Sequence, residues 1–337
     1  MIERGLVFAQ RRSPLSLCAA LAGALLVPLA ISAASAQANY PDRSVRLVVP
    51  YGAGGVADVG MRILSEKLST HLKQQFVVEN RPGAGGIIAA KAVSSSPADG
   101  YTLLMTGNNN AISASMFKSL PYNVLTDFAS VSTTSFFDLL IVTRANSPLK
   151  TLQDVVKTAR ANPGKINAAT TNPGSTQNLA ALLFGSVTDS KISIVPYRTS
   201  SEMATAVLRG DVDIAFEFYS ALVGPIADKQ IVALASTGPK RASYLTNVPT
   251  VKEAGIDNYE VLSWNGISVP TGTPPQVVQV LNRAIGEVLK APDLQEKART
   301  MGMEMRGSTP EAMNEIMKSD TAKWAAVIEK ANIPKQE

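Results

Sequence analysis

The sequence predicts an α/β protein made of two doubly wound lobes joined by a hinge. Short runs rich in β-branched residues alternate with helix-length amphipathic segments, a pattern typical of parallel sheets covered by helices on both faces. The chain has 337 residues, more than one hydrophobic core usually supports, so two lobes are expected. A glycine-containing turn joins a strand to a helix in each half of the chain, which favours a cleft between the lobes.

The first 36 residues have the composition of an export signal. Arginines at positions 4, 11 and 12 precede an apolar run over 15–31, and small residues at 34–36 form a cleavage site. A membrane anchor would need about 20 unbroken apolar residues, whereas Pro28 interrupts this run. We therefore expect cleavage near Ala36 and a periplasmic protein. One lobe is expected to hold residues 37–142 and 264–337, and the other residues 143–263.

Composition excludes several classes of chemistry. The single cysteine, Cys18, lies in the export signal, so the mature chain lacks disulfides, thiolate metal sites and cysteine nucleophiles. The single histidine, His71, lies in a polar helical stretch and is expected at the surface. The net charge of +5 falls to +3 on cleavage, because the signal carries three arginines and one glutamate. Basic residues are dispersed along the chain, so no nucleic-acid partner is expected. The sequence implies no metal or organic cofactor. We expect a monomer.

The predicted elements follow the alternation in order. Strands are expected at 46–49, 76–79, 102–106, 139–143, 166–169, 192–195, 212–216, 232–236 and 261–269. Helices are expected at 58–72, 152–161, 178–184, 202–208, 274–289 and 310–332, with a short strand near 303–306. Proline and glycine at 163–164 end the second of these helices before the next strand.

The most informative segment runs from Leu47 to Asp58, an apolar strand entering a turn that carries Gly52, Gly54 and Gly55. The first amides of a helix lack intrahelical partners and carry partial positive charge, so such a turn can cradle a carboxylate or phosphate. The glycine spacing matches neither a dinucleotide fingerprint nor a phosphate loop. A purely structural alternative is a capped helix start.

A second polar turn, Thr170 to Thr176, repeats this arrangement in the other half, with Ser175 or Thr176 as alternative helix caps. The asparagines at 108–110 follow another apolar strand and either line the cleft or form a loop. Glu217 ends a strand among aromatic residues, where its carboxylate either receives a ligand's donor group or caps a helix. Arg198 either pairs with a ligand's charge or is solvated.

Eight further segments, in this order, make the chain resemble a known family. They lie at 40–50, 78–86, 97–104, 120–128, 162–165, 195–197, 210–213 and 248–255, and include Val78-Glu-Asn-Arg-Pro-Gly-Ala-Gly-Gly86 and Pro97-Ala-Asp-Gly-Tyr-Thr-Leu-Leu104. The chain resembles the extracytoplasmic solute receptors of tripartite tricarboxylate transporters, also called Bug-type receptors. The resemblance spans essentially the whole mature chain.

The resemblance implies a hinged periplasmic-binding-protein (Venus flytrap) fold that traps a small organic acid, aliphatic or aromatic, and delivers it to membrane permease subunits without acting on it chemically. In such receptors backbone amides and bridging waters at the first turn grip one carboxylate. The matching ligand-binding positions here are Tyr51, Ala53, Gly54, Gly55, Val56, Ala57, Asn108, Asn109, Thr171, Gly174, Ser175, Thr176, Tyr197, Arg198, Thr199 and Glu217.

This chain departs from the family's pattern in both turns. Gly52, Val56 and Ala57 replace a proline, a glycine and a threonine, which removes a hydroxyl and makes the pocket floor more apolar. Asn178 stands where histidine is usual, Glu217 where aspartate is frequent, and Arg198-Thr199 where lysine-glycine is common. An aromatic acid flanked by the phenylalanines at 136, 137, 216 and 218 is one hypothesis for the ligand; core packing is the alternative for these side chains.

Two other functions remain open at this stage. A periplasmic enzyme using Glu217, Asp58 and water would need the two carboxylates side by side. A sensory receptor that presents its bound ligand to a membrane kinase would have the same fold and cleft as a transport receptor.

Overall fold

The computed structural model describes residues 1–2 and 40–337. Apart from its first two residues, the predicted export signal, Cys18 included, lies outside the described residues. Residues 43–337 form one compact unit. In the part of the chain that is described, no helix combines the length and apolarity required to cross a membrane.

The sheet of this unit is continuous, in the order β2-β1-β3-β9-β4-β7-β5-β6, with β8 and β10 also pairing with β4. Its strands are β1 (Val45–Val49), β2 (Phe76–Asn80), β3 (Thr102–Gly107), β4 (Phe128–Arg144), β5 (Asn167–Thr170), β6 (Ser193–Pro196), β7 (Ile214–Phe218), β8 (Ile231–Ser236), β9 (Leu262–Pro270) and β10 (Glu304–Met305).

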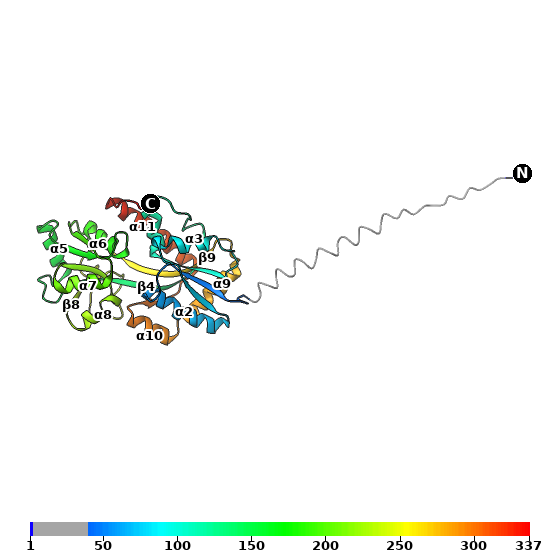
Figure 1. Cartoon of the computed structure of the whole chain (residues 1–337), viewed down its shortest axis with the longest axis horizontal. Coiled ribbons are helices and arrows are strands. Elements are labelled where there is room, and N and C mark those ends of the chain that lie inside the picture. The colour runs from blue at the N-terminus through cyan, green and yellow to red at the C-terminus, as the bar shows by residue number, and fades with distance from the viewer. Residues whose placement is uncertain (3–39) are drawn as a thin grey trace. The chain divides into compact units, whose positions relative to one another are not determined.

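The helices gather around the two ends of the sheet, with α5, α6, α7 and α8 at one end and α2, α3 and α9 at the other (Figure 1). Their bounds are α2 (Val56–Leu72), α3 (Ile87–Ser94), α4 (Asn108–Met116), α5 (Leu152–Ala161), α6 (Thr176–Val187), α7 (Ser200–Arg209), α8 (Val223–Ala227), α9 (Pro275–Val288), α10 (Pro292–Thr300) and α11 (Pro310–Lys330). Two short 3₁₀ turns lie at Ala84–Gly86 and Tyr219–Ala221.

The antiparallel pair of β4 and β9 connects the two ends of the sheet. At one end β2, β1 and β3 are parallel, and at the other β6, β5 and β7 are parallel. β4 pairs with β9 up to Asp138 and with β7 and β8 from Leu139 onward. The change of partner lies a few residues before the predicted lobe boundary at 142/143, and that boundary and the one at 263/264 remain predictions.

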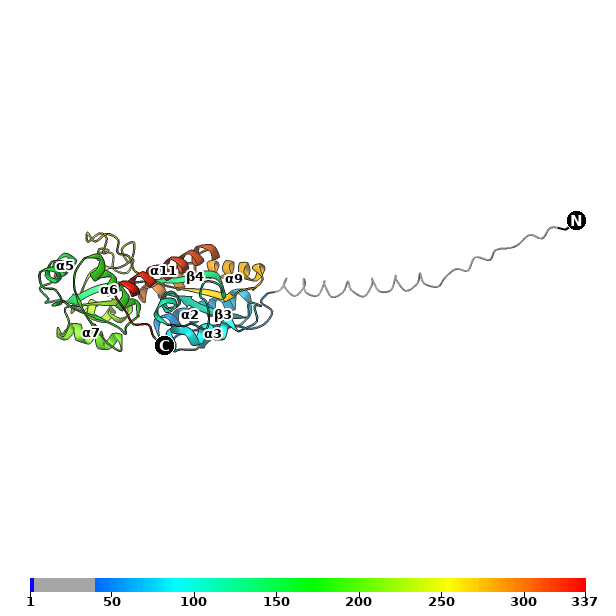
Figure 2. The same cartoon turned by 90° about the horizontal axis from the view of Figure 1, so that it is seen from above.

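The C-terminal helix α11 packs along α4 and α6, so it touches both ends of the sheet (Figure 2). Its Trp324 is fully buried and donates a 2.7 Å hydrogen bond from Nε1 to Asn108 Oδ1. Its Asp320 accepts a 2.8 Å bond from Trp264 Nε1 of β9. These bonds satisfy the polar atoms of two buried tryptophans and fix α11 against the sheet.

Most predicted elements are present with shifts of one to three residues at their ends, but β4 is far longer than the predicted 139–143. Its first part contains four polar residues, Ser132, Thr133, Thr134 and Ser135, so the sequence there lacks the hydrophobic pattern of a strand. These residues are nevertheless buried, and their hydroxyls form hydrogen bonds to neighbouring chain segments. α3, α4, α8 and α10 were not predicted. Asn108–Asn110, expected in a loop or at the cleft, form the first turn of α4, although asparagine favours turns over helix interiors.

Candidate functional site

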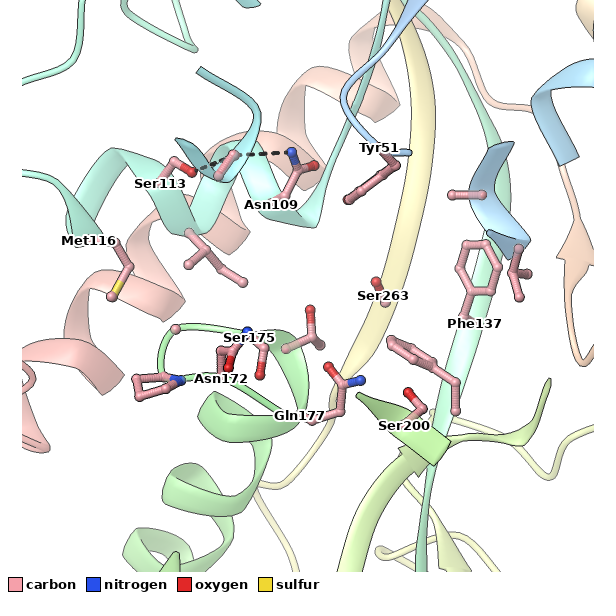
Figure 3. A pocket seen from close by; sticks show the side chains of 18 of the residues that line it. Tyr51, Asn109, Ser113, Met116, Phe137, Asn172, Ser175, Gln177, Ser200 and Ser263 are labelled. Carbon is pink, nitrogen blue, oxygen red and sulfur yellow. Dashed lines mark hydrogen bonds between the residues drawn. The ribbon is translucent and has the colours of Figure 1, made fainter. Parts of the chain in front are cut away.

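A cavity of about 750 Å³ lies where the two ends of the sheet meet. Segments from far apart in the sequence line it, among them Tyr51 after β1, α4, the turn before α6, Phe137 of β4 and Ser263 of β9 (Figure 3). The side chains labelled in the close-up view project from these elements toward the same space. The cavity therefore has the placement expected of a ligand site between two α/β lobes.

The first turn joins β1 to α2 and is held by a buried aspartate. Gly54 has φ +87°, and its amide donates a 2.8 Å hydrogen bond to Asp58 Oδ2. Asp58 is 1% exposed and also accepts bonds from Arg62 Nε at 2.9 Å and Asn80 Nδ2 at 2.7 Å. Burial raises the pKa of Asp58, but the hydrogen bonds from Arg62, Asn80 and Gly54 outweigh it, so its pKa lies below the usual value.

The start of α2 is left open to the cavity. Val56 and Ala57, the first two residues of the helix, line the cavity, and among the described residues no side chain caps this helix. Their amides, together with that of the following residue, lack intrahelical acceptors. Because Arg62 neutralises Asp58, the turn offers partial positive charge to an anion.

The second turn joins β5 to α6 and has the same internal geometry. Gly174 has φ +81°, and its amide donates a 3.1 Å bond to the Asn178 side-chain oxygen, as Gly54 does to Asp58 four residues further on. Ser175 caps α6 by accepting a 3.1 Å bond from the Asn178 amide. Gly174, Ser175 and Thr176 line the cavity. The two turns therefore face one cavity with the same glycine geometry, and they differ in that Ser175 caps α6 whereas no side chain among the described residues caps α2.

The start of α4 connects the second turn to the segment around Gly85. Asn108 Nδ2 donates a 3.0 Å bond to Thr176 Oγ1. Ser113 Oγ donates to the Gly85 carbonyl at 3.0 Å, and Asn109 Nδ2 donates to the same oxygen at 3.4 Å (Figure 3). Asn109 and Ser113 line the cavity, whereas Asn108 lies behind its wall.

Glu217, at the end of β7, is the one carboxylate among the described residues that line the cavity. Its Oε1 accepts bonds from Gln177 Nε2 at 3.1 Å and from the Phe218 amide at 2.6 Å. Its Oε2 is buried and, among the described residues, has no hydrogen-bond partner. Burial raises the pKa of Glu217, and the Ser200 hydroxyl, the Phe218 amide and Gln177 offset this only in part.

The rest of the lining is apolar or neutral. Met116, Phe117, Ile112, Phe137 and Phe218 supply the apolar surface, and the Phe137 and Phe218 rings meet edge to face at 6.1 Å. The other two phenylalanines of the aromatic hypothesis lie elsewhere: Phe216 packs on Phe184 in the core, and Arg306 covers the ring of Phe136. Within the described part of the lining there is no Lys, Arg or His.

The predicted site residues fall into two groups. Those that line the cavity are Tyr51, Val56, Ala57, Asn109, Gly174, Ser175, Thr176 and Glu217. Those that shape or flank it without lining it are Ala53, Gly54, Gly55, Asn108, Thr171, Tyr197, Arg198 and Thr199.

The second group has structural contacts of its own. Thr199 caps α7 by accepting a 3.1 Å bond from the Glu202 amide, and the Arg198 amide donates to Glu202 Oε2 at 3.2 Å. Tyr197 borders a separate hollow over α7. The Thr171 carbonyl accepts the hydroxyl of Thr170 at 2.9 Å.

Sequence reasoning missed several lining residues that come from distant segments. Ser263 and Asn265 come from β9, and Gln336 comes from the C-terminal tail, whose amide donates a 2.7 Å bond to the Met116 carbonyl. Two of the missed residues were predictable. Ser113 lies four residues after Asn109 on one helix face, and Gln177 lies in the first turn of α6.

An α/β fold whose central strands join two parallel sheet ends around a polar, glycine-lined cavity defines the class of extracytoplasmic solute-binding proteins. Residues 61–333 match the family described as tripartite tricarboxylate transporter family receptor. The chain belongs to this family, as its sequence resemblance indicated.

Individual relatives match over nearly their full lengths. Protein BugT of Bordetella pertussis is 32% identical, over 92% of this chain and 95% of BugT. The structure of R. palustris Rpa4515 with adipate is 32% identical with TM-score 0.75, over 88% of this chain and 99% of that one. MatC of Rhodopseudomonas palustris with bound malate is 25% identical with TM-score 0.71, over 86% and 100%.

Proposed function

We propose that this protein is a periplasmic receptor that captures a small organic carboxylate in the cavity and delivers it to the membrane permease of a tripartite tricarboxylate-type transporter. The observation that carries the proposal is a pair of turns that each contain a glycine with positive φ, Gly54 and Gly174. The helices that follow these turns, α2 and α6, both begin at the wall of one cavity. The adipate and malate held by two related receptors support the same ligand class.

Capture by this site needs no cationic side chain. Amides at a helix start bind a carboxylate by hydrogen bonds and the helix dipole, and they are positioned before the ligand arrives. One lobe consists of residues 37–142 and 264–337, and the other of residues 143–263. Contacts from the second turn are added when these lobes close about β4 and β9. A ligand favours the closed form only by the extra contacts made there.

We infer that the protein binds its ligand without converting it. The alternative enzymatic reading needs Asp58 beside Glu217, but Asp58 is buried behind the first turn, where Arg62 and Asn80 bind it. Glu217 alone among the described lining residues carries a carboxylate, so the paired acid and base of that mechanism are not brought together.

The test is a thermal-shift and calorimetric screen of the purified protein against aliphatic carboxylates, aromatic carboxylates and uncharged amides of matched size. An acid present at 100 times its Kd should add about 2.7 kcal/mol to the free energy of unfolding. Uptake of that acid by cells should then fall when either the receptor or the permease is deleted. Stabilisation by uncharged compounds alone would contradict the carboxylate site, and normal uptake without the permease would contradict the transport role.

A further inference from the structure

The charges that line the cavity limit which carboxylates it can hold. Its described lining holds one carboxylate, Glu217, and no cationic side chain. The amides of the two turns can satisfy one carboxylate of a ligand, but a second carboxylate at the far end would meet no Lys or Arg. The chemical group that the ligand places against Glu217 therefore has to be one that a carboxylate can bind.

One oxygen of the Glu217 carboxylate, Oε2, is available to accept a hydrogen bond from a ligand. Its Oε1 is occupied by Gln177 and the Phe218 amide, which also fix the carboxylate plane. Within the described part of the chain Oε2 is left without a partner, although the residue is only 1% exposed. A buried acceptor without a donor is rare in native proteins and costs free energy until a ligand or a water supplies one.

Two neighbours of Glu217 carry hydrogen-bond donors. Gln177 already donates to Oε1. The Ser200 hydroxyl borders the same part of the cavity and lowers the pKa of Glu217, but among the described residues its geometry falls short of a hydrogen bond to Oε2. Phe218 follows Glu217 in β7, and its ring packs edge to face on that of Phe137 in the cavity lining. A ligand group that enters here replaces water in a site of low polarity, where its hydrogen bond is strengthened.

We propose that the ligand is a monocarboxylate whose far end carries an O–H or N–H donor that binds Glu217 Oε2. The inference rests on the proposed function, because the turns must hold the carboxylate end. A hydroxyl, a primary amide or an ammonium group shares the required donor chemistry. A second carboxylate does not, since it would place two like charges in contact in a cavity that offers no cation.

The proposal is tested by isothermal titration calorimetry with probes that share a carbon skeleton and differ at one end. For the four-carbon chain these are butyrate, 4-aminobutyrate, succinamate and succinate, and for the six-carbon chain hexanoate, 6-aminohexanoate, adipamate and adipate. The aromatic set is 4-methylbenzoate, 4-hydroxybenzoate, terephthalamate and terephthalate. On the skeleton that fits, we expect a donor-ended probe to bind at least tenfold more tightly at pH 7.5 than both the methyl-ended acid and the diacid. The amine and amide arms distinguish a cationic donor from a neutral one.

Glu217→Gln supplies the second comparison. It removes the charge and should reduce the preference for the donor-ended probe over the diacid at least tenfold. Glu296→Gln makes the same charge change on the exposed helix α10 and should leave the preference unaltered. Glu217→Asp keeps the charge but shortens the side chain, so the donor-ended probe should bind less tightly while the diacid stays excluded. This variant replaces Glu217→Gln in the comparison if Glu217→Gln unfolds.

The outcomes separate the two levels of the argument. If no carboxylate of any skeleton binds, the proposed function itself fails. If the diacid binds as tightly as the half-amide and Glu217→Gln leaves their ratio unchanged, the carboxylate site stands and the donor proposal is overturned. Diacid affinity that rises steeply as the pH is lowered would also overturn it, because protonated Glu217 would then act as the donor.

Discussion

The side-chain amide of Asn108 donates a 3.0 Å hydrogen bond to Thr176 Oγ1, which joins the start of α4 to the start of α6. Its oxygen accepts a 2.7 Å bond from Trp324 Nε1. Because indole nitrogen can only donate, this second bond fixes the orientation of the amide. One buried asparagine thus ties the second anion turn to the opposite side of the cavity and to the C-terminal helix.

Thr176→Val should weaken both ligand binding and the fold, each by a similar free energy. Valine keeps the shape of threonine but removes the hydroxyl that Asn108 bonds, so we expect a loss of about 1 kcal/mol in unfolding free energy and a severalfold rise in Kd. Urea unfolding and calorimetry measure the two effects. Thr205→Val on α7, where the hydroxyl bonds only its own helix, is the matched control. An unchanged Kd would show that this bond does not position the turn.

Asn108→Ala should cost more stability than Thr176→Val. It leaves the buried Trp324 Nε1 without an acceptor and also creates a small cavity, so we expect a loss of about 2–4 kcal/mol. Asn108→Asp, which keeps the acceptor for Trp324, should recover part of this loss. Equal losses for the alanine and valine variants would contradict a role for the tryptophan bond.

The charge of Asp58 should stabilise the fold at neutral pH and not in acid. Its pKa lies below the usual value in the folded protein, so the stabilisation is present above the unfolded pKa, near 3.9, and is lost as the pH falls through the folded one. We expect Asp58→Asn to lower the unfolding free energy by about 2 kcal/mol at pH 7 and to differ little from the wild type near pH 2. Unfolding curves at the two pH values measure this, and Asp228→Asn on the surface should show no such change. A deficit that persists in acid would point to packing instead of charge.

The two glycine-containing turns were predictable from the sequence because their cause is local. A strand that ends in glycines before an amphipathic helix can be read from composition alone, and Tyr51, Val56, Ala57, Ser175 and Thr176 line the cavity as part of that pattern. Glu217 was also readable, as an isolated carboxylate in an apolar strand end. The Gly174 amide donates a hydrogen bond to the Asn178 side-chain oxygen, so the asparagine that stands where the family usually has histidine helps to hold the second turn.

The remaining lining depends on contacts between distant segments. Gln336 reaches the cavity only because the C-terminal tail pairs with the end of α4, and no local pattern indicates that. The start of α4 was misleading for a different reason: Asn108 favours a turn by propensity, but its bonds to Thr176 and Trp324 hold it in a helix.

Gly54→Ala should destabilise the first turn through backbone strain alone. Gly54 has φ +87° and nothing within 4 Å of an added Cβ, so the cost is conformational, about 1–2 kcal/mol. The strained turn should also bind the carboxylate less tightly. Gly286→Ala in α9 is the matched control, since nothing lies within 4 Å of its added Cβ either and helical alanine is favoured, so it should be neutral or stabilising. Equal effects of the two substitutions on unfolding would exclude backbone strain as the cause.

Asp138 occupies the face of β4 that points away from the ligand cavity. It borders a second hollow with Lys240, Tyr244 and Glu304. Burial is the main reason that its pKa rises to about 6; the negative charges of Glu304 and Glu260 add to the rise, and Lys240 opposes it. Ionised Asp138 therefore costs stability, at the point where β4 changes its strand partners.

Asp138→Asn should stabilise the protein above pH 6 and have little effect below pH 4. Because the folded pKa is raised, the protonated acid contributes stability that is present below the unfolded pKa and is lost as the pH rises through about 6. Asparagine mimics the protonated form at every pH. The difference between 3.8 and about 6 corresponds to a gain of roughly 3 kcal/mol at pH 8, measurable by urea unfolding at pH 3.5 and pH 8, with Asp228→Asn as the exposed control. A gain of equal size at both pH values would mean that the amide improves packing, because relief of a buried charge must vanish once the acid is protonated.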